Sequence, residues 1–184
     1  DLNDVSVIQR NKAKQANFGI IYGITTFGLA QRMDITNNEA KELIADYFKT
    51  FPKVKAYMDL SIEEARQKGY AETIFHRRRY LADINSKYAT VRGYAERNAI
   101  NAPIQGSEAD IIKVAMVRIW QRFKRENIRS KMILQVHDEL NFSVFPDEKD
   151  RVERIVIEEM QQAYALNVPL IADAGWGDNW LEAH

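Results

Sequence analysis

The sequence predicts an α+β protein that is mostly helical. Through most of the first half, apolar residues recur every three or four positions, which is the period of a helix. Between Met132 and Val144 they alternate with polar residues in two short runs, which is typical of a β-hairpin. The 184 residues are 46% hydrophobic and 28% charged, the usual balance of a globular domain. We expect a helical subdomain over residues 1–85 and an α+β subdomain over residues 86–184.

Capping and breaking residues delimit the helices of the first half. Thr36 and Glu39 have the spacing of a capping box. Pro52 suits a first helical position, and Gly69 suits the residue that ends a helix. The helices expected here span residues 5–22, 26–33, 36–49 and 52–69.

The rest of the chain mixes short strands with helices. Residues 70–75 and 79–81 read as two strands around a turn at His76. Pro103 has no amide hydrogen, so we expect it to interrupt a helix that starts at Ser86. The later elements expected are helices 86–100 and 104–126, the hairpin at 132–144, a helix at 149–164 and a strand at 169–175.

Composition excludes several classes of protein. There is no cysteine, so a disulfide scaffold, a thiolate zinc site and a cysteine nucleophile are excluded. No apolar run approaches the ~20 residues of a membrane span, and we expect neither a membrane segment nor a signal peptide. The 26 basic and 26 acidic residues cancel, but bases predominate at 66–97 and 118–131 and acids at 138–159. This uneven charge favours either a polyanion-binding face or ordinary solvated helices.

The first candidate site is a stripe on the first helix. Arg10, Lys14, Phe18 and Tyr22 are four residues apart and share one broad helical face. Two cations followed by two rings would suit a nucleotide, with the cations at the phosphates and the rings at sugar and base. The alternative is an ordinary amphipathic helix whose aromatic residues belong to the core.

The second candidate is the sequence His137-Asp138-Glu139, at the tip of the expected hairpin. Adjacent carboxylates on a tight turn suit Mg²⁺ with phosphate oxygens, although acidic pairs also occur in turns for solubility. The apolar strands on both sides indicate a buried sheet, where charge is costly unless it has a function.

The third candidate is Arg97, Asn101 and Gln105, again four residues apart. These side chains can bond to base edges and sugars, but Pro103 leaves their shared face uncertain.

Together these features resemble the family A DNA polymerases of the bacterial DNA polymerase I type. Residues 10–23 (RNKAKQANFGIIYG) resemble motif B of the fingers, and residues 135–139 (QVHDE) resemble motif C of the palm. Residues 95–107 (AERNAINAPIQGS) resemble the primer–template contact segment, and residues 175–184 resemble the family's C-terminus. The family usually has glycine where His76 stands, which puts the turn there in doubt.

The resemblance implies a role for each residue of the stripe. Arg10 and Lys14 would hold the triphosphate of an incoming dNTP, with Lys14 the candidate general acid for the pyrophosphate leaving group. Phe18 would pack on the sugar, where phenylalanine goes with discrimination against dideoxynucleotides. Tyr22 would stack near the template base.

The resemblance also implies a two-metal reaction on primer–template DNA. Asp138 would be one of two aspartates that hold the catalytic Mg²⁺ ions, and Glu139 would support it. The remaining candidates would line the minor groove of the primer–template: Arg97, Asn101, Gln105 and His137. The primer 3′-oxygen would attack the α-phosphorus in line. The protein would act in DNA replication and repair, in the bacterial cytoplasm and associated with the nucleoid.

The family's other metal-binding aspartate belongs to motif A, upstream of motif B, and no such segment stands in these 184 residues. We therefore expect fingers over residues 1–85 and the later palm over residues 86–184, without motif A or thumb. We expect this chain to be inactive alone. The alternatives are a non-catalytic fragment that binds DNA and a structural domain that binds nothing appreciable.

Overall fold

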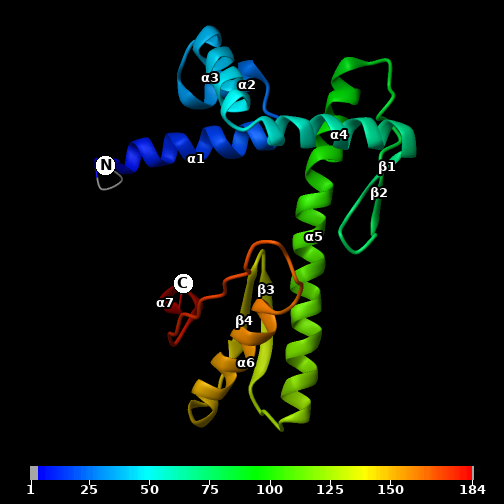
Figure 1. Ribbon diagram of the computed structural model, residues 1–184. Helices are drawn as coiled ribbons and strands as arrows, with labels where there is room; N and C mark the ends of the chain where they lie inside the picture. The colour runs from blue at the N-terminus through cyan, green and yellow to red at the C-terminus, as the bar shows by residue number, and fades with distance from the viewer. Residues whose placement is uncertain (1–3, 184) are drawn as a thin grey trace. The chain divides into compact units, whose positions relative to one another are not determined.

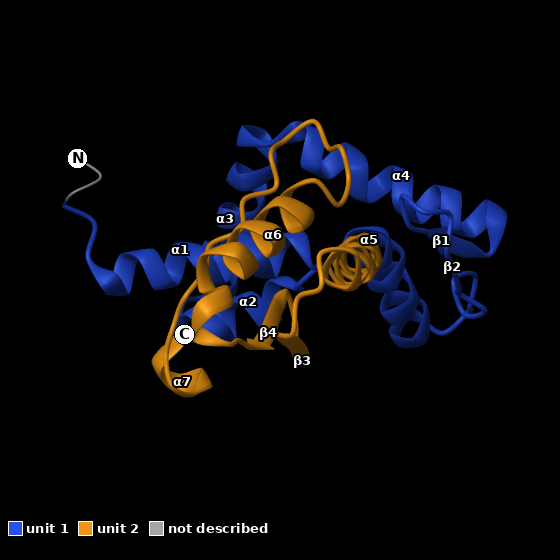
Figure 2. Cartoon of the chain, turned by 90° about the horizontal axis from the view of Figure 1, so that it is seen from below, with its two compact units in different colours: residues 1–104 blue, residues 105–184 orange. Residues whose placement is uncertain are grey.

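A computed structural model describes residues 4–183. The chain divides into two compact units, residues 1–104 and 105–184 (Figure 2). Each unit is mainly helical and contains one two-stranded antiparallel sheet, which confirms the predicted α+β class. The boundary between the units lies within one helix, whereas the division into fingers and palm near residue 85 stays a prediction.

The elements follow one another as Figure 1 shows. Unit 1 contains α1 (Val7–Ile21), α2 (Thr26–Met33), α3 (Asn37–Thr50), α4 (Pro52–Lys68), β1 (Tyr70–Glu72), β2 (Arg78–Tyr80) and the first part of α5 (Ala89–Arg125). Unit 2 contains the rest of α5, then β3 (Lys131–Val136), β4 (Glu139–Ser143), η2 (Pro146–Glu148), α6 (Lys149–Gln161) and α7 (Trp180–Ala183). Within residues 4–183, no helix is both long enough and apolar enough to cross a membrane.

Local capping sets the helix ends of unit 1, largely as predicted. The Thr36 hydroxyl accepts a hydrogen bond from the Glu39 amide at 3.2 Å, and the Glu39 carboxylate accepts one from the Thr36 amide at 2.8 Å. Gly69 ends α4 with a φ of +78°, in the left-handed region that glycine adopts without steric cost. A second capping box, between Ser6 and Gln9, starts α1 at Val7 rather than at the expected residue 5.

The predicted break at Pro103 is wrong, because α5 is a single helix of 37 residues. A proline inside a helix costs about 3 kcal/mol, since it removes one hydrogen bond and crowds the preceding turn. On both sides of Pro103, however, α5 places residues in the interior, Ala99 in unit 1 and Ile112 in unit 2. Tertiary burial of this kind is the main source of helix stability in proteins, and here it outweighs the local cost.

The predicted strand at residues 169–175 is also wrong, because that segment is irregular. The described part of unit 2 has one sheet, formed by β3 and β4, and residues 169–175 do not pair with it. Ile171, which the strand would have buried, is 77% exposed. Other boundaries differ by a few residues: α5 starts at Ala89, β1 ends at Glu72 and α6 ends at Gln161.

The turn between β1 and β2 forms despite the residue that replaces glycine. His76 has a φ of 63°, and its Nδ1 lies 2.7 Å from Glu72 Oε1. Arg78 Nε donates to the other oxygen of Glu72 at 3.1 Å. These two partners, His76 first, lower the pKa of the Glu72 carboxyl. The Glu72 carboxylate therefore bonds to residues on both sides of the turn. These bonds offset the strain of a histidine in the left-handed region.

Each unit has its own apolar core. In unit 1, one cluster joins α4, β1 and α5, and another joins α1, α2 and α3. In unit 2, the buried face of α5 packs against α6, with the β3–β4 hairpin beside them. The buried members of the unit 2 cluster are Ala115, Ile119, Phe123, Val152, Ile155 and Ala163.

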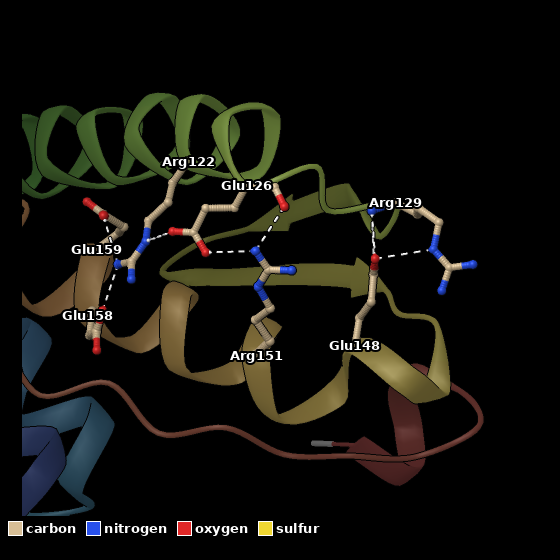
Figure 3. A network of polar contacts seen from close by, with 7 residues as sticks. All are labelled: Arg122, Glu126, Arg129, Glu148, Arg151, Glu158 and Glu159. Carbon is tan, nitrogen blue, oxygen red and sulfur yellow. Dashed lines mark hydrogen bonds and ion pairs between the residues drawn. The ribbon is translucent and has the colours of Figure 1, made fainter.

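Charged groups reinforce the contact between α5 and α6 (Figure 3). The Arg122 guanidinium bonds to Glu126 at 2.8 Å, to Glu158 at 2.6 Å and to Glu159 at 3.1 Å. Arg151 of α6 reaches the carboxylate of Glu126 at 3.2 Å. The three carboxylates, Glu126 first, raise the pKa of Arg122, so the network keeps its positive centre at any ordinary pH.

A buried carboxylate joins the start of β3 to the start of α6. Glu148 is 8% exposed and accepts hydrogen bonds from the amides of Arg129 at 3.0 Å and Ser130 at 2.9 Å. The Ser130 hydroxyl adds a bond of 2.6 Å. These donors, the Arg129 amide first, lower the pKa of Glu148 from 4.5 to about 2.

The lowered pKa of Glu148 predicts how the stability of unit 2 depends on pH. The folded state favours the ionised carboxyl, so its contribution is present above pH 4.5 and is lost as the pH falls toward 2. We expect the urea midpoint of unfolding, measured by circular dichroism, to drop over this range. Glu148→Gln should lower the midpoint at pH 7 and reduce this acid dependence by the part that Glu148 contributes.

Asp150→Asn is the matched control, because this exposed carboxylate lies two residues further along the chain, in α6. It should leave both the midpoint and its acid dependence close to those of the wild type. An unchanged acid dependence in Glu148→Gln would contradict the prediction.

Candidate functional site

The predicted stripe lies along α1, with Tyr22 as the residue that ends the helix. The rings of Phe18 and Tyr22 stack with centroids 6.2 Å apart and an angle of 18° between their planes. Lys14 Nζ lies 6.0 Å from the centroid of the Phe18 ring. Arg10 is exposed one turn further toward the N-terminus. The stripe therefore presents two cations followed by two rings that are already stacked.

Both rings face solvent, so they do not belong to the core of unit 1. Phe18 is 46% exposed and Tyr22 is 36% exposed. The buried residues of α1 are the small or aliphatic Ala16, Gly19 and Ile20. A Cβ at Gly19 would lie 3.3 Å from the Ile24 side chain, so the helix packs closely on that side. The alternative in which the aromatic residues form the core is wrong for this chain.

The structure brings Arg97 to the end of this stripe. Gly23 follows Tyr22 with a φ of +74°, and a Cβ there would lie 3.1 Å from Arg97 Cγ. Arg97 therefore packs against the turn that follows the stacked rings. Glycine is required at this position both for its backbone conformation and for this close approach.

The other two residues of the third group lie further along α5. Arg97 and Asn101 both lie within α5, four residues apart, and so share one helical face. Asn101 Oδ1 is buried without a hydrogen-bond partner, so the amide oxygen points inward. Gln105 is exposed and is the first residue of unit 2.

His137 and Asp138 form the two-residue turn between β3 and β4, where Val136 pairs with Glu139. His137 has a φ of 53°, a conformation that non-glycine residues seldom adopt. Gln135 Nε2 donates to the His137 carbonyl at 2.6 Å and so closes the turn from one side. His137 and Asp138 are exposed, whereas Glu139 is half-buried.

The hairpin itself is less buried than its apolar sequence predicts. A bulge between Met132 and Leu134 shifts the register of β3, and Ile133 and Leu134 are 64% and 48% exposed. Met132 and Phe142 pack toward the core of unit 2. The expectation of a buried sheet is therefore wrong for this chain, and burial gives no support to a function for Asp138.

One contact at the hairpin tip involves Trp180, for which the sequence motifs predict no role. The Trp180 indole Nε1 donates a hydrogen bond to Glu139 Oε2 at 3.3 Å. The two residues are 41 positions apart, and no periodic pattern connects them. Gln135 belongs to a recognised motif but also had no assigned role.

The carboxylates at the hairpin tip have the right chemistry for Mg²⁺ but are too few. Asp138 and Glu139 supply hard oxygen donors side by side. Among residues 4–183, no group of three or more histidine, cysteine, aspartate or glutamate side chains could hold a metal ion. The two carboxylates therefore fit part of a magnesium site.

Residues 1–182 match the family model described as DNA polymerase family A. The chain belongs to this family. It is 50% identical over 182 residues to DNA polymerase I of Caldicellulosiruptor bescii, covering 99% of this chain and 21% of that polymerase. It is 51% identical over 180 residues to DNA polymerase I of Geobacillus stearothermophilus, covering 98% of this chain and 20% of that one. This family A chain thus spans about a fifth of the length of its curated relatives.

A solved structure of a family member has the same fold. It is the POL domain of Pol1 from M. smegmatis, in complex with DNA primer-template and dNTP. The TM-score is 0.96 at 43% sequence identity, and the match covers 100% of this chain and 32% of the other.

The contact between Gln135 and His137 predicts a measurable change at the hairpin tip. Gln135→Ala removes a hydrogen bond that contributes about 1 kcal/mol, so the turn should open about fivefold more often. Amide hydrogen exchange should report this as faster exchange next to the turn, with unchanged exchange in α5. Gln121→Ala, an exposed glutamine of α5, is the control and should change neither. Equal exchange at the tip in both variants would contradict the prediction.

Proposed function

We propose that this chain is the part of a template-directed DNA polymerase that binds the incoming nucleotide and supplies half of the catalytic carboxylates. The complete enzyme adds deoxynucleotides to a primer 3′ end, in DNA replication and repair within the bacterial cytoplasm, at the nucleoid. The observation that carries this proposal is the exposed face of α1, where Lys14 lies next to a stacked pair of rings. The likeness to a POL domain in complex with DNA primer-template and dNTP supports it.

The α1 stripe binds the dNTP in this proposal. Arg10 and Lys14 lie one helical turn apart and neutralise successive phosphates of the triphosphate. Lys14 Nζ donates a proton to the pyrophosphate as it leaves. Phe18 packs on the sugar and Tyr22 stacks near the template base. The planes of the two rings are already within 18° of parallel, which suits stacking on a nucleotide.

The hairpin tip supplies carboxylate ligands for Mg²⁺ in this proposal. Asp138 and Glu139 would hold Mg²⁺, which when bound stabilises the charge on the attacking and leaving oxygens. The two-residue turn presents Asp138 to solvent, where a primer end and a triphosphate can reach it. Gln135 and the left-handed His137 restrict the conformations of that turn, so Asp138 is presented in one direction.

Polar side chains of α5 and of the hairpin tip contact the primer–template in this proposal. Arg97, Asn101, Gln105 and His137 line its minor groove in this proposal. Arg97 packs against the turn after Tyr22. Its contact with the minor groove therefore lies next to the place where Tyr22 stacks near the template base. Asn101 contributes its amide nitrogen, since its oxygen is buried.

We further propose that the chain does not polymerise by itself. Two adjacent carboxylates cannot hold a pair of metal ions, and residues 4–183 provide no third ligand in reach. The missing partner is the preceding part of the polymerase, with motif A and the thumb. If the isolated chain binds DNA without catalysis, its affinity should fall steeply with salt, because Lys and Arg would contact phosphates.

Primer extension tests the function directly. The chain alone, with Mg²⁺ and four dNTPs, should give no extension, whereas a longer polymerase containing these residues after motif A should extend the primer. In that polymerase, Asp138→Asn should lower the single-turnover rate on the order of 10³-fold. Asp173→Asn, an exposed carboxylate outside the motif, should have little effect. Extension by the isolated chain that Asp138→Asn abolishes would contradict the proposed missing ligand.

Replacement of Lys14 tests the nucleotide-binding face. In the same longer polymerase, Lys14→Ala should lower the single-turnover rate about 10²- to 10⁴-fold, the usual range for a lost general acid. Its melting temperature should stay unchanged, because the side chain is exposed. Lys12→Ala, from another face of α1, should keep nearly full activity. Loss of the fold in Lys14→Ala would mean that this face is structural.

A further inference from the structure

The C-terminal segment of unit 2, residues 175–183, is anchored on α6. Trp176 Nε1 donates to Glu153 Oε2 at 2.6 Å. Lys149 Nζ lies 4.5 Å from the centroid of the Trp176 ring, as a cation over an aromatic face. Two residues of α6, one turn apart, therefore hold the indole of Trp176 from two sides.

Beyond this anchor the segment folds back on itself. The Glu182 carboxylate accepts hydrogen bonds from the Asp178 amide at 3.1 Å and from Asn179 Nδ2 at 2.6 Å. A Cβ at Gly175 would lie 1.9 Å from the Ala183 carbonyl oxygen, and one at Gly177 would lie 2.5 Å from Glu182 Cβ. The segment is thus a closed loop. Only glycine fits at residues 175 and 177, where the backbone approaches Glu182 and Ala183.

The closed loop carries Trp180 to the hairpin tip. Its indole Nε1 donates to Glu139 Oε2 at 3.3 Å, although half of the Trp180 side chain remains exposed. Glu139 follows Asp138 directly and pairs with Val136 across the turn. A hydrogen bond to one carboxylate oxygen restricts the rotation of that group and leaves the other oxygen a defined direction.

We propose that Trp180 is a positioning residue for polymerisation, which it serves by orienting the Glu139 carboxylate beside Asp138. The inference rests on the proposed role of the hairpin tip in holding Mg²⁺. The segment of residues 175–183 then supports the hairpin tip of the active site through Trp180. Loss of the indole N–H removes one of the contacts that orient the Glu139 carboxylate, so a higher concentration of Mg²⁺ is needed for the same rate.

The contact can be tested without any enzymatic activity. The chain has three tryptophans, and each gives one indole N–H signal in a ¹⁵N-labelled sample. Glu139→Gln should shift the Trp180 signal and leave that of Trp120, an exposed residue of α5, in place. An unshifted Trp180 signal would show that the contact is absent and would overturn the inference, whatever the activity of the polymerase.

The positioning role is tested in the longer polymerase, by single-turnover rates over a range of Mg²⁺ concentrations. Trp180→Phe keeps the ring but loses the donor, and should lower the rate at limiting Mg²⁺ about three- to tenfold. The Mg²⁺ concentration for half-maximal rate should rise, with the melting temperature unchanged. Trp120→Phe is the matched control and should behave as the wild type.

A double variant decides whether Trp180 acts through Glu139. Trp180→Phe should add nothing in a Glu139→Ala background, because the acceptor is already absent. Additive effects, or a normal Mg²⁺ dependence in Trp180→Phe, would overturn the inference while the polymerase remained active. A wild-type polymerase that fails to extend a primer would instead refute the proposed function, and the indole signals would still report on the contact.

Discussion

Burial of apolar residues of α5 is the constraint on which both units depend. In unit 1 its Ala95 and Ala99 complete a cluster with residues of α4 and β1. In unit 2 its Ile119 and Phe123 pack against α6, and Ile119 is wholly buried. Apolar burial of this kind is the dominant favourable contribution to folding. It also explains why the helix continues through Pro103 at a local cost.

The candidate functional groups lie outside these cores, on elements that pack against them through other residues. α1 buries Gly19 and Ile20 on one side, which leaves the stacked rings of Phe18 and Tyr22 on the other. The hairpin packs Phe142 into unit 2 and projects its two-residue turn away from that contact. A rigid support matters because a catalytic group must be held in one geometry before its substrate arrives.

Sequence reasoning succeeded where the determining interactions are local. The capping box of Thr36 and the glycine at residue 69 fix helix ends within a few residues of themselves. The continuity of α5 and the irregular path of residues 169–175 could not be predicted in this way. Both depend on whether a distant element covers or pairs with the segment, and neither Pro103 nor Ile171 carries that information.

The candidate site was predictable to a similar extent. Helical spacing placed the four residues of the stripe on one face, but only packing around Gly19 decides that this face is exposed. The motif at residues 135–139 identified the hairpin tip, whereas its contact with Trp180 spans 41 positions. Contacts between such separated side chains arise from the path of the whole chain, here through the anchor at Trp176.

The small residues at the centre of unit 1 have a consequence for how this chain can evolve. Ala65, Ala71, Ala95 and Ala99 are all at most 8% exposed and come from three different elements. A larger side chain at any of them would push helices apart, and overpacking of this kind costs about 1–3 kcal/mol. Substitution by a larger residue at these positions is therefore expected to destabilise unit 1. The core of unit 1 therefore limits the size of the side chains that these positions tolerate, independently of any constraint from the candidate site.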